Sequence, residues 1–265
     1  RDRSHRYTDP AHWTELARLL EEGLFDAVFL ADVLGVYDVY RGSLDAALEH
    51  GVQVPLNDPL ALVPIMAQAT THLGFGVTCA LTYEHPYAFA RRMSTLDHLT
   101  GGRMGWNIVT GYLDSAARNL GLNQQLGHDE RYDLADEYLE VVYKLWEKSW
   151  DDDAVVNDKA RGIYADPAKV HPINHAGRHY QVPGIHLCEP SPQRTPLLYQ
   201  AGTSPRGTRF AARHAEATFV SGPSKTVVKR YADDLRAAVR QSGRDGDALL
   251  IYAQALVITG ATEEE

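Results

Sequence analysis

The chain has 265 residues, of which 44% are apolar, and its 26 basic and 35 acidic residues give a formal net charge of −9. This length and composition predict one α/β domain over residues 1–265 with a large buried core. The acidic balance argues against general affinity for nucleic acid or for anionic membranes, so a small molecule is the expected ligand. No signal peptide and no apolar run of about 18 residues is visible, which favours a soluble, cytoplasmic protein.

Short apolar runs alternate with amphipathic segments along the chain. Asp9-Pro10 and Asp58-Pro59 each pair an N-cap carboxylate with a proline at the first helical position. The predicted helices cover residues 10–23, 58–71, 87–99, 129–150 and 224–241, with another starting at Ser204-Pro205, and the predicted strands cover 25–31, 73–81, 104–110, 196–201, 217–221 and 248–259. Strands this apolar, separated by helices, are typical of parallel βα units with right-handed crossovers.

The number of predicted strands is compatible with two architectures. A closed (β/α)8 TIM barrel needs eight strands, so in a barrel the first strand would precede Arg1 and the last would follow Glu265. A six-stranded doubly wound sheet is the alternative. We expect the barrel, truncated at both ends, because the chain starts and stops abruptly.

Two segments are longer than ordinary connections. Residues 33–57 form a polar loop after the first strand, and residues 151–195 form an excursion with five prolines and no clear periodicity, in which Tyr164 and residues 171–184 suggest a small hairpin. Segments of this kind are usually functional or form interaction surfaces. We expect both to contribute to a lid over the site.

Polar residues recur at the ends or within the predicted strands. Asp32 follows the first strand, Thr78 lies in the second, and Asn107 and Thr110 lie near the end of the third. The carboxyl ends of barrel strands meet at one mouth, where ligands bind. Asp32 taken alone is equally explained as a helix N-cap. The recurrence of polar groups at this structural point favours a site.

Two predicted helix starts add further candidates. Gly202 permits a close backbone approach before the Ser204-Pro205 helix start, and the free amides there, with Arg206 nearby, are suited to a phosphate, although any capped helix shares these features. His128 and Tyr132 are four residues apart in the first turn of a long helix and face one side, with Arg131 between them. A core tyrosine with a histidine at its rim is the structural alternative.

Several chemistries lack their sequence signatures. HExxH, GxSxG and GxGxxG patterns are absent, and neither Cys79 nor Cys188 clusters with histidines. We therefore expect no metal site, no serine nucleophile of the elbow type and no dinucleotide-binding fold of that type. Cys79 lies in an apolar run and is interpreted as a small buried thiol.

Long stretches of the sequence resemble a known family. LDHLTGGRMGWNIVTGY, HDERYDLADEYLEVVYKLWEKSW, ADPAKVHPINHAG and PSPQRTPLLYQAGTSPRGTRFAARHAEATFVS resemble the nitrilotriacetate and dibenzothiophene sulfone monooxygenase branch of the bacterial luciferase-like flavin monooxygenases. The resemblance implies a (β/α)8 barrel that uses O2 and reduced FMN, which a separate NAD(P)H-dependent flavin reductase delivers. It also implies oxidation of a small organic substrate through a flavin C4a-(hydro)peroxide, with cleavage of a C–N or C–S bond, in a homodimer or homotetramer.

The resemblance also implies which residues form the site. The cofactor-binding positions are Asp32, Thr78, Asn107, His128, Arg131, Tyr132, Gly202, Thr203 and Ser204, and the catalytic positions are Asn107, Thr110 and Phe29. One position departs from the pattern, because Gly111 stands where the family usually has serine after WNIVT. A hydroxyl needed there would have to come from Thr110 or from water.

Two other functions stay open. One is an F420-dependent reductase built on the same scaffold, and the other is a non-catalytic flavin-binding relative, which Gly111 makes plausible. The sequence does not name the substrate. Arg91, Arg92 and Arg206 are candidate contacts for an anionic substrate, but each is also an ordinary surface cation.

Overall fold

A computed structural model of the chain describes residues 4–202, 204–257 and 260. The chain divides into two compact units, Arg1–Leu197 and Leu198–Glu265. Each unit alternates parallel strands with helices, as the sequence predicts. Within the described part of the chain, no helix has both the length and the apolarity that a membrane crossing requires. The expected single domain over residues 1–265 stays a prediction.

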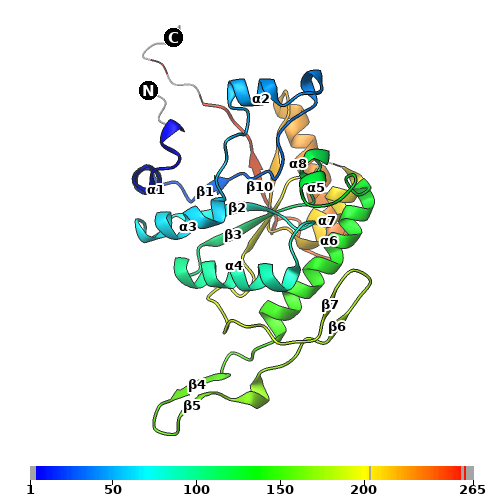
Figure 1. Cartoon of the computed structure of the whole chain (residues 1–265). Helices are drawn as coiled ribbons and strands as arrows, with labels where there is room; N and C mark the ends of the chain where they lie inside the picture. Colours follow the sequence, from blue (N-terminus) through cyan, green and yellow to red (C-terminus); the bar gives the residue numbers. More distant parts are fainter. Residues whose placement is uncertain (1–3, 203, 258–259, 261–265) are drawn as a thin grey trace. The chain divides into compact units, whose positions relative to one another are not determined.

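The first unit is built on three parallel strands in the order β1 (Ala27–Leu30), β2 (Gly74–Ala80) and β3 (Met104–Val109). Its longer helices are α1 (Pro10–Glu22), α3 (Pro59–Gln68), α4 (Pro86–Thr100) and α6 (His128–Tyr143), the last continuing as a π-helical turn (Lys144–Lys148). Figure 1 shows α3 and α4 along one side of β2 and β3. Each strand matches a predicted apolar run and is one to three residues shorter than predicted.

Local capping explains where the first helices begin. The Asp9 carboxylate accepts a hydrogen bond from the Ala11 amide at 2.9 Å, and the Asp58 carboxylate accepts one from the Leu60 amide at 2.9 Å. In both cases proline takes the first helical position, where its missing N–H costs nothing. These N-caps confirm the helix starts predicted from the two Asp-Pro pairs.

An aromatic cluster forms the core between the strands and the helices of the first unit. Trp106 of β3 is fully buried. The centroid of its ring lies 4.5 Å from the ring centroid of Phe89 on α4 and 6.0 Å from that of Tyr138 on α6. Successive side chains of a strand face opposite sides. Because Trp106 faces the helices, the neighbouring Asn107 lies on the other face of the sheet.

Residues 33–57 are more ordered than a plain loop. They contain a 3-10 turn (Tyr40–Gly42) and α2 (Asp45–His50), and they contact the segment after β3, which contains α5 (Asp114–Asn119). Ser115 Oγ donates to the Val36 carbonyl at 2.9 Å, and Arg118 pairs with Asp38 at 2.8 Å. The segment therefore lies beside the carboxyl end of β3.

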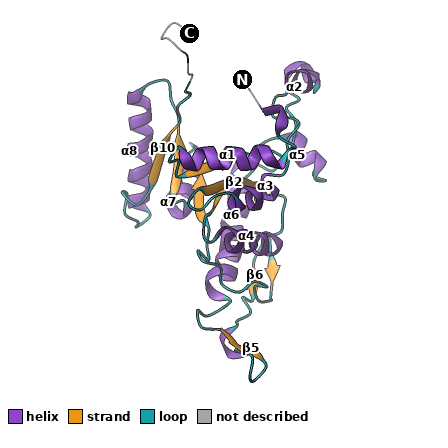
Figure 2. Ribbon diagram, turned by 90° about the vertical axis from the view of Figure 1, so that its left-hand side faces the viewer, coloured by secondary structure: helices purple, strands orange, loops and turns teal. Residues whose placement is uncertain are grey.

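The 151–195 excursion contains two hairpins, β4–β5 (Val155–Asp158 and Ile163–Ala165) and β6–β7 (His175–Ala176 and Gln181–Val182). It is held on α4 by His186 Nε2, 2.9 Å from Ser94 Oγ, and on α6 by the Glu137 carboxylate, which accepts from the amides of His179 and Tyr180. Figures 1 and 2 show the β4–β5 hairpin at the opposite end of this unit from α2. The β4–β5 hairpin is therefore remote from residues 33–57, and the expected contribution of the excursion to a lid stays a prediction.

The second unit repeats the βα pattern. Its parallel strands follow the order β8 (Leu197–Gln200), β9 (Ala217–Val220) and β10 (Leu250–Ala253), with α7 (Pro205–His214) and α8 (Lys225–Gln241) between them in sequence. Small and branched side chains, among them Ala211, Val220 and Val239, form its core. β10 pairs with all four residues of β9 and covers part of the predicted 248–259 strand, of which residues 258–259 lie outside the described part of the chain.

Candidate active site

A hydrogen-bonded pair lies on the face of the sheet opposite the aromatic cluster. Thr78 of β2 and Asn107 of β3 are directly paired in the strand register, and Asn107 Nδ2 donates to Thr78 Oγ1 at 2.9 Å. Both residues are 5% exposed. Asn107 Oδ1 is buried and has no hydrogen-bond partner within the described residues. Such a buried acceptor is costly unless a ligand donor satisfies it.

Asp32 opens onto a pocket beyond the ends of β1 and β2. The pocket has a volume of about 450 Å³, and its wall also contains Asp58, Glu84 and Arg92. Partial burial raises the pKa of both Asp32 and Glu84, because removal from water penalises the charged carboxylate. Arg92 forms an ion pair with Glu84. The wall of this pocket therefore contains three carboxyl groups and one guanidinium group, and the guanidinium is already paired with one of the carboxylates.

Two residues that the sequence did not point to connect this pocket to the start of α6. Tyr83 lines the pocket, and its hydroxyl accepts a hydrogen bond from Gln125 Nε2 at 2.5 Å. The Gln125 Oε1 atom accepts from the Leu126 amide at 3.0 Å. No motif marks either residue, because their association depends on how the loops after β2 and β3 meet.

Both the backbone conformation and the limited space at position 111 favour glycine. Its φ angle is +69°, a left-handed conformation that side chains disfavour. A Cβ atom at this position would lie 3.1 Å from the Tyr83 hydroxyl and 3.4 Å from Gln125 Nε2. The departure from the family's serine therefore coincides with the close approach of Tyr83.

The start of α6 brings its predicted residues together. The rings of His128 and Tyr132 are 5.3 Å apart, which confirms that they share one side of the helix, and Tyr132 is 7% exposed. Arg131 Nη1 donates to the Leu126 carbonyl at 2.6 Å. Leu126 thus links Arg131 to Gln125, and through it to Tyr83. The Arg131 Nε atom is buried and finds no acceptor in the described part of the chain.

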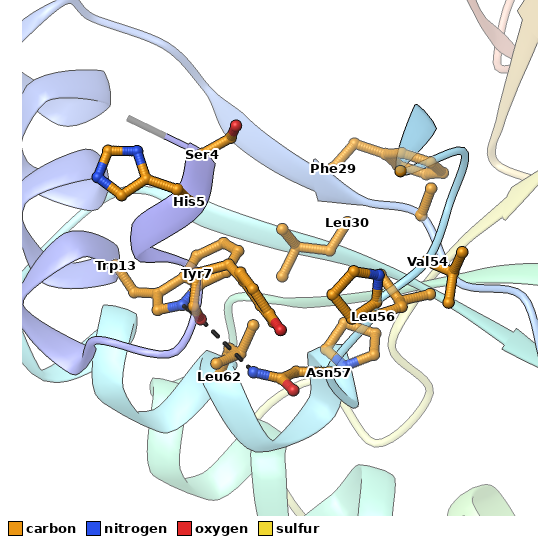
Figure 3. Close-up of a pocket in the computed structure, with 14 residues that line it drawn as sticks. Ser4, His5, Tyr7, Trp13, Phe29, Leu30, Val54, Leu56, Asn57 and Leu62 are labelled. Atoms are coloured by element: carbon orange, nitrogen blue, oxygen red, sulfur yellow. Dashed lines mark hydrogen bonds between the residues drawn. The ribbon is translucent and has the colours of Figure 1, made fainter. Parts of the chain in front are cut away.

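The two remaining catalytic candidates of the first unit are Thr110, which directly follows β3, and Phe29 of β1, which pairs with Gly76 in the strand register. The Thr110 carbonyl accepts from Thr82 Oγ1 at 2.6 Å. Phe29 is 40% exposed and lines a second pocket of about 470 Å³, with mostly apolar walls that include Trp13 and Leu56. Figure 3 shows these side chains around the pocket, together with the hydrogen bond that the Asn57 side-chain amide (Nδ2) donates to the Tyr7 backbone carbonyl.

The predicted phosphate-binding turn belongs to the second unit. Ser204 is the N-cap of α7, and its Oγ accepts from the Gly207 amide at 3.0 Å, which confirms the predicted helix start. Gly202 precedes it, and Thr203 lies outside the described residues. The association of this turn with the residues of the first unit stays a prediction.

The described residues do not form a metal-binding cluster. Across residues 4–202, 204–257 and 260, no group of three or more His, Cys, Asp or Glu side chains could hold a metal ion. Both cysteines are free thiols. Burial raises the pKa of the Cys79 thiol, so it stays protonated near neutral pH.

Comparison with known proteins decides the family. Residues 1–265 match the family described as luciferase-like monooxygenase. The chain belongs to this family. Long-chain alkane monooxygenase of Geobacillus thermodenitrificans is 59% identical over 98% of this chain and 59% of its own length, and dimethyl-sulfide monooxygenase of Hyphomicrobium sulfonivorans is 55% identical over 98% of this chain and 54% of its own. The dibenzothiophene-sulfone and nitrilotriacetate monooxygenases of the expected branch are also relatives, at 45% and 36% identity.

Solved structures agree with the family assignment. The crystal structure of the long-chain alkane monooxygenase has a TM-score of 0.95, covering 98% of this chain and 60% of that one. The structure of a riboflavin lyase with modified FMN and riboflavin has a TM-score of 0.89 at 40% identity, covering 94% of this chain and 56% of that one. The chain therefore has the luciferase-like α/β fold, and it spans less than two thirds of the length of these relatives.

Proposed function

We propose that this chain is part of an FMNH2-dependent, two-component monooxygenase that uses O2 to oxidise a small organic substrate, with cleavage of a C–N or C–S bond. Membership of the luciferase-like monooxygenase family supports the reaction class. The observation that carries the proposal for this chain is the buried Thr78–Asn107 pair with its unpartnered Asn107 oxygen.

The polar groups of the first unit fit a flavin. A flavin ring carries N–H donors and carbonyl acceptors along one edge, and Asn107 Oδ1 offers an acceptor for such a donor. Asp32, His128, Arg131 and Tyr132 would complete the contacts, with Gly202, Thr203 and Ser204 binding the phosphate through backbone amides. Reduced FMN, when bound, supplies the electrons with which O2 is activated for oxygen transfer.

The protein side chains would position the reactants and exclude water. Thr78 fixes the Asn107 amide by accepting from Nδ2, so that Oδ1 keeps one orientation. Phe29 would place an apolar surface beside the substrate, since it lines the pocket next to β1. Thr110 follows β3 and is our candidate for a hydroxyl near the reacting oxygen. An apolar, enclosed surrounding would protect the activated oxygen from water.

The charge around the 450 Å³ pocket, whose wall includes the proposed flavin contact Asp32, disfavours a polyanionic substrate beside the flavin. Asp32, Asp58 and Glu84 line it against Arg92, which pairs with Glu84. A carboxylate-rich pocket of this kind repels polyanions such as aminopolycarboxylates. This charge therefore favours an uncharged substrate over a polyanionic one, for either bond class.

Membership of the family supports a proposal for the remaining partners. We propose that a separate NAD(P)H-dependent flavin reductase delivers the reduced FMN, and that the protein works in the cytoplasm as a homodimer or homotetramer without a metal. The alternatives are an F420-dependent reductase and a non-catalytic flavin-binding protein. Reduced F420 oxidised by the chain without O2 would support the first, and FMN binding without any turnover would support the second.

Oxygen uptake tests the proposal. The chain is incubated with FMN, NADH and an unrelated flavin reductase, and O2 uptake and product are measured with dimethyl sulfide, dibenzothiophene sulfone, a long-chain alkane and nitrilotriacetate. We expect product formation coupled to O2 uptake with dimethyl sulfide or dibenzothiophene sulfone and none with nitrilotriacetate. Turnover of the alkane alone would contradict cleavage of a C–N or C–S bond. Turnover of nitrilotriacetate alone would contradict the substrate charge, and the absence of both FMN binding and product would contradict the function.

A further inference from the structure

The hydrogen bonds around Tyr83 have a fixed direction. The Leu126 amide donates to Gln125 Oε1 at 3.0 Å, which assigns the carbonyl side of the Gln125 amide. The Nε2 atom therefore faces the Tyr83 hydroxyl, 2.5 Å away, and an amide nitrogen can only donate. The Tyr83 oxygen is the acceptor in this bond, so its own proton remains available.

That proton has no acceptor among the residues that the structure describes. Tyr83 belongs to the wall of the 450 Å³ pocket, together with Asp32 and Ala80. The absence of a side chain at Gly111 leaves room beside the hydroxyl, since a Cβ there would approach it to 3.1 Å. The hydroxyl thus lies where the loops after β2 and β3 meet, with one donor direction unused.

We propose that Tyr83 is a ligand-binding residue that donates a hydrogen bond to an acceptor atom of the bound flavin, and that Gln125 directs its proton there. This inference rests on the proposed function, because it needs a flavin in the site. A flavin ring offers carbonyl oxygens and ring nitrogens as acceptors for such a donor. The proposal adds Tyr83 and Gln125 to a site in which Asn107 supplies the complementary acceptor.

Two changes remove the same donor by different routes. Tyr83→Phe deletes the hydroxyl. Gln125→Glu keeps it but reverses the bond, because a carboxylate can accept from the Leu126 amide and from Tyr83 but cannot donate. If the proton is what binds the flavin, the two variants behave alike. Loss of one neutral hydrogen bond corresponds to a rise of roughly fivefold in the FMN dissociation constant.

Matched controls separate this effect from general ones. Tyr87→Phe removes a hydroxyl that donates to the Ile185 carbonyl at 3.2 Å, away from the pocket wall. Gln124→Glu adds the same negative charge one residue earlier, at an exposed position. Circular dichroism melting of all four variants shows whether each is folded.

The experiment is a titration of the chain and its variants with FMN, followed by flavin fluorescence and by the position of the bound-flavin absorption band. We expect the dissociation constant to rise and the band to move in Tyr83→Phe and Gln125→Glu, and neither to change in the two controls. An unchanged FMN dissociation constant in either Tyr83→Phe or Gln125→Glu would overturn the proposal. If the unaltered chain binds no FMN, the proposed function itself fails.

Discussion

Asn107 donates to the Thr78 hydroxyl oxygen at 2.9 Å, from directly paired positions on two neighbouring parallel strands. The two side chains are buried on the face of the sheet that the aromatic core does not occupy. A threonine and an asparagine in this setting lose the contribution that valine or isoleucine would make to the core. Their pairing leaves one amide oxygen for a ligand, which is the basis of the proposed site.

Replacing the acceptor of this pair should destabilise the chain. In Thr78→Val the Asn107 Nδ2 group stays buried without its partner, and we expect the free energy of unfolding to fall by about 2 kcal/mol. Thr78→Ser keeps the hydroxyl and should lose less, about 1 kcal/mol for the missing methyl group. Urea unfolding measures both. Equal losses in the two variants would show that the hydrogen bond contributes nothing.

A side chain at Gly111 should be poorly tolerated. Gly111→Ala places a Cβ 3.1 Å from the Tyr83 hydroxyl at a φ of +69°, whereas Gly101→Ala imposes a similar strain at +62° with no atom within 4 Å. The left-handed conformation alone costs about 1 kcal/mol. We expect Gly111→Ala to lower the melting temperature more than Gly101→Ala does. Adding Tyr83→Phe should recover part of the difference, and no recovery would place the strain elsewhere.

Stability should fall at mildly acidic pH because of His186. This residue is 3% exposed, and burial lowers its pKa from 6.5 to about 4. Between about pH 6.5 and pH 4 the unfolded chain therefore binds a proton at this residue that the folded chain does not. The free energy of unfolding has its highest value above pH 6.5 and decreases as the pH falls toward 4. The loss near pH 4.5 should be about 2 kcal/mol.

The matched variants for this prediction are His186→Asn and His171→Asn. His171 is an exposed histidine of the same excursion, so His171→Asn is the control for the substitution itself. Urea midpoints between pH 5 and 7.5 should lose their slope in His186→Asn only. A slope that survives this change would assign the effect to other groups.

The Glu21 carboxylate should make the stability of the fold depend on pH in a more acidic range. Its carboxylate accepts from the amides of His72 at 2.7 Å, Leu73 at 2.8 Å and Thr71 at 3.0 Å, and these bonds lower its pKa from 4.5 to about 2. The ionised Glu21 carboxylate therefore stabilises the fold fully above pH 4.5, and this stabilisation is lost as the pH falls toward 2. Glu21→Gln should lower the urea midpoint at pH 7, and Glu22→Gln, one residue on, should not. Equal midpoints for the two variants at pH 7 would exclude a role for the carboxylate.

Local patterns predicted most of the fold. The starts of α1, α3 and α7 follow from the capping residues Asp9, Asp58 and Ser204, because a cap acts within one helical turn. The course of residues 151–195 was not predictable, because it depends on distant partners. The Ser94–His186 contact, for example, joins residues 92 positions apart in sequence.

The candidate site was predicted in part for the same reason. The recurrence of polar residues in successive predicted strands indicated Thr78 and Asn107, and the hydrogen bond between them confirms that they lie together. Tyr83 and Gln125 were missed, since their hydrogen bond joins two loops that share no sequence signal. The sequence alone shows that Gly111 differs from the serine usual in the family. Only the structure shows why glycine suits this position, through its positive φ angle and the nearby Tyr83 hydroxyl.

Hydrogen exchange of the chain with and without FMN tests the central claim most directly. We predict that FMN slows exchange in peptides covering residues 78–83, 107–111 and 125–132, which include Thr78, Asn107 and the start of α6. Exchange in the β4–β5 hairpin should stay the same. Protection confined to that hairpin, or no protection at FMN concentrations that saturate binding, would contradict the account.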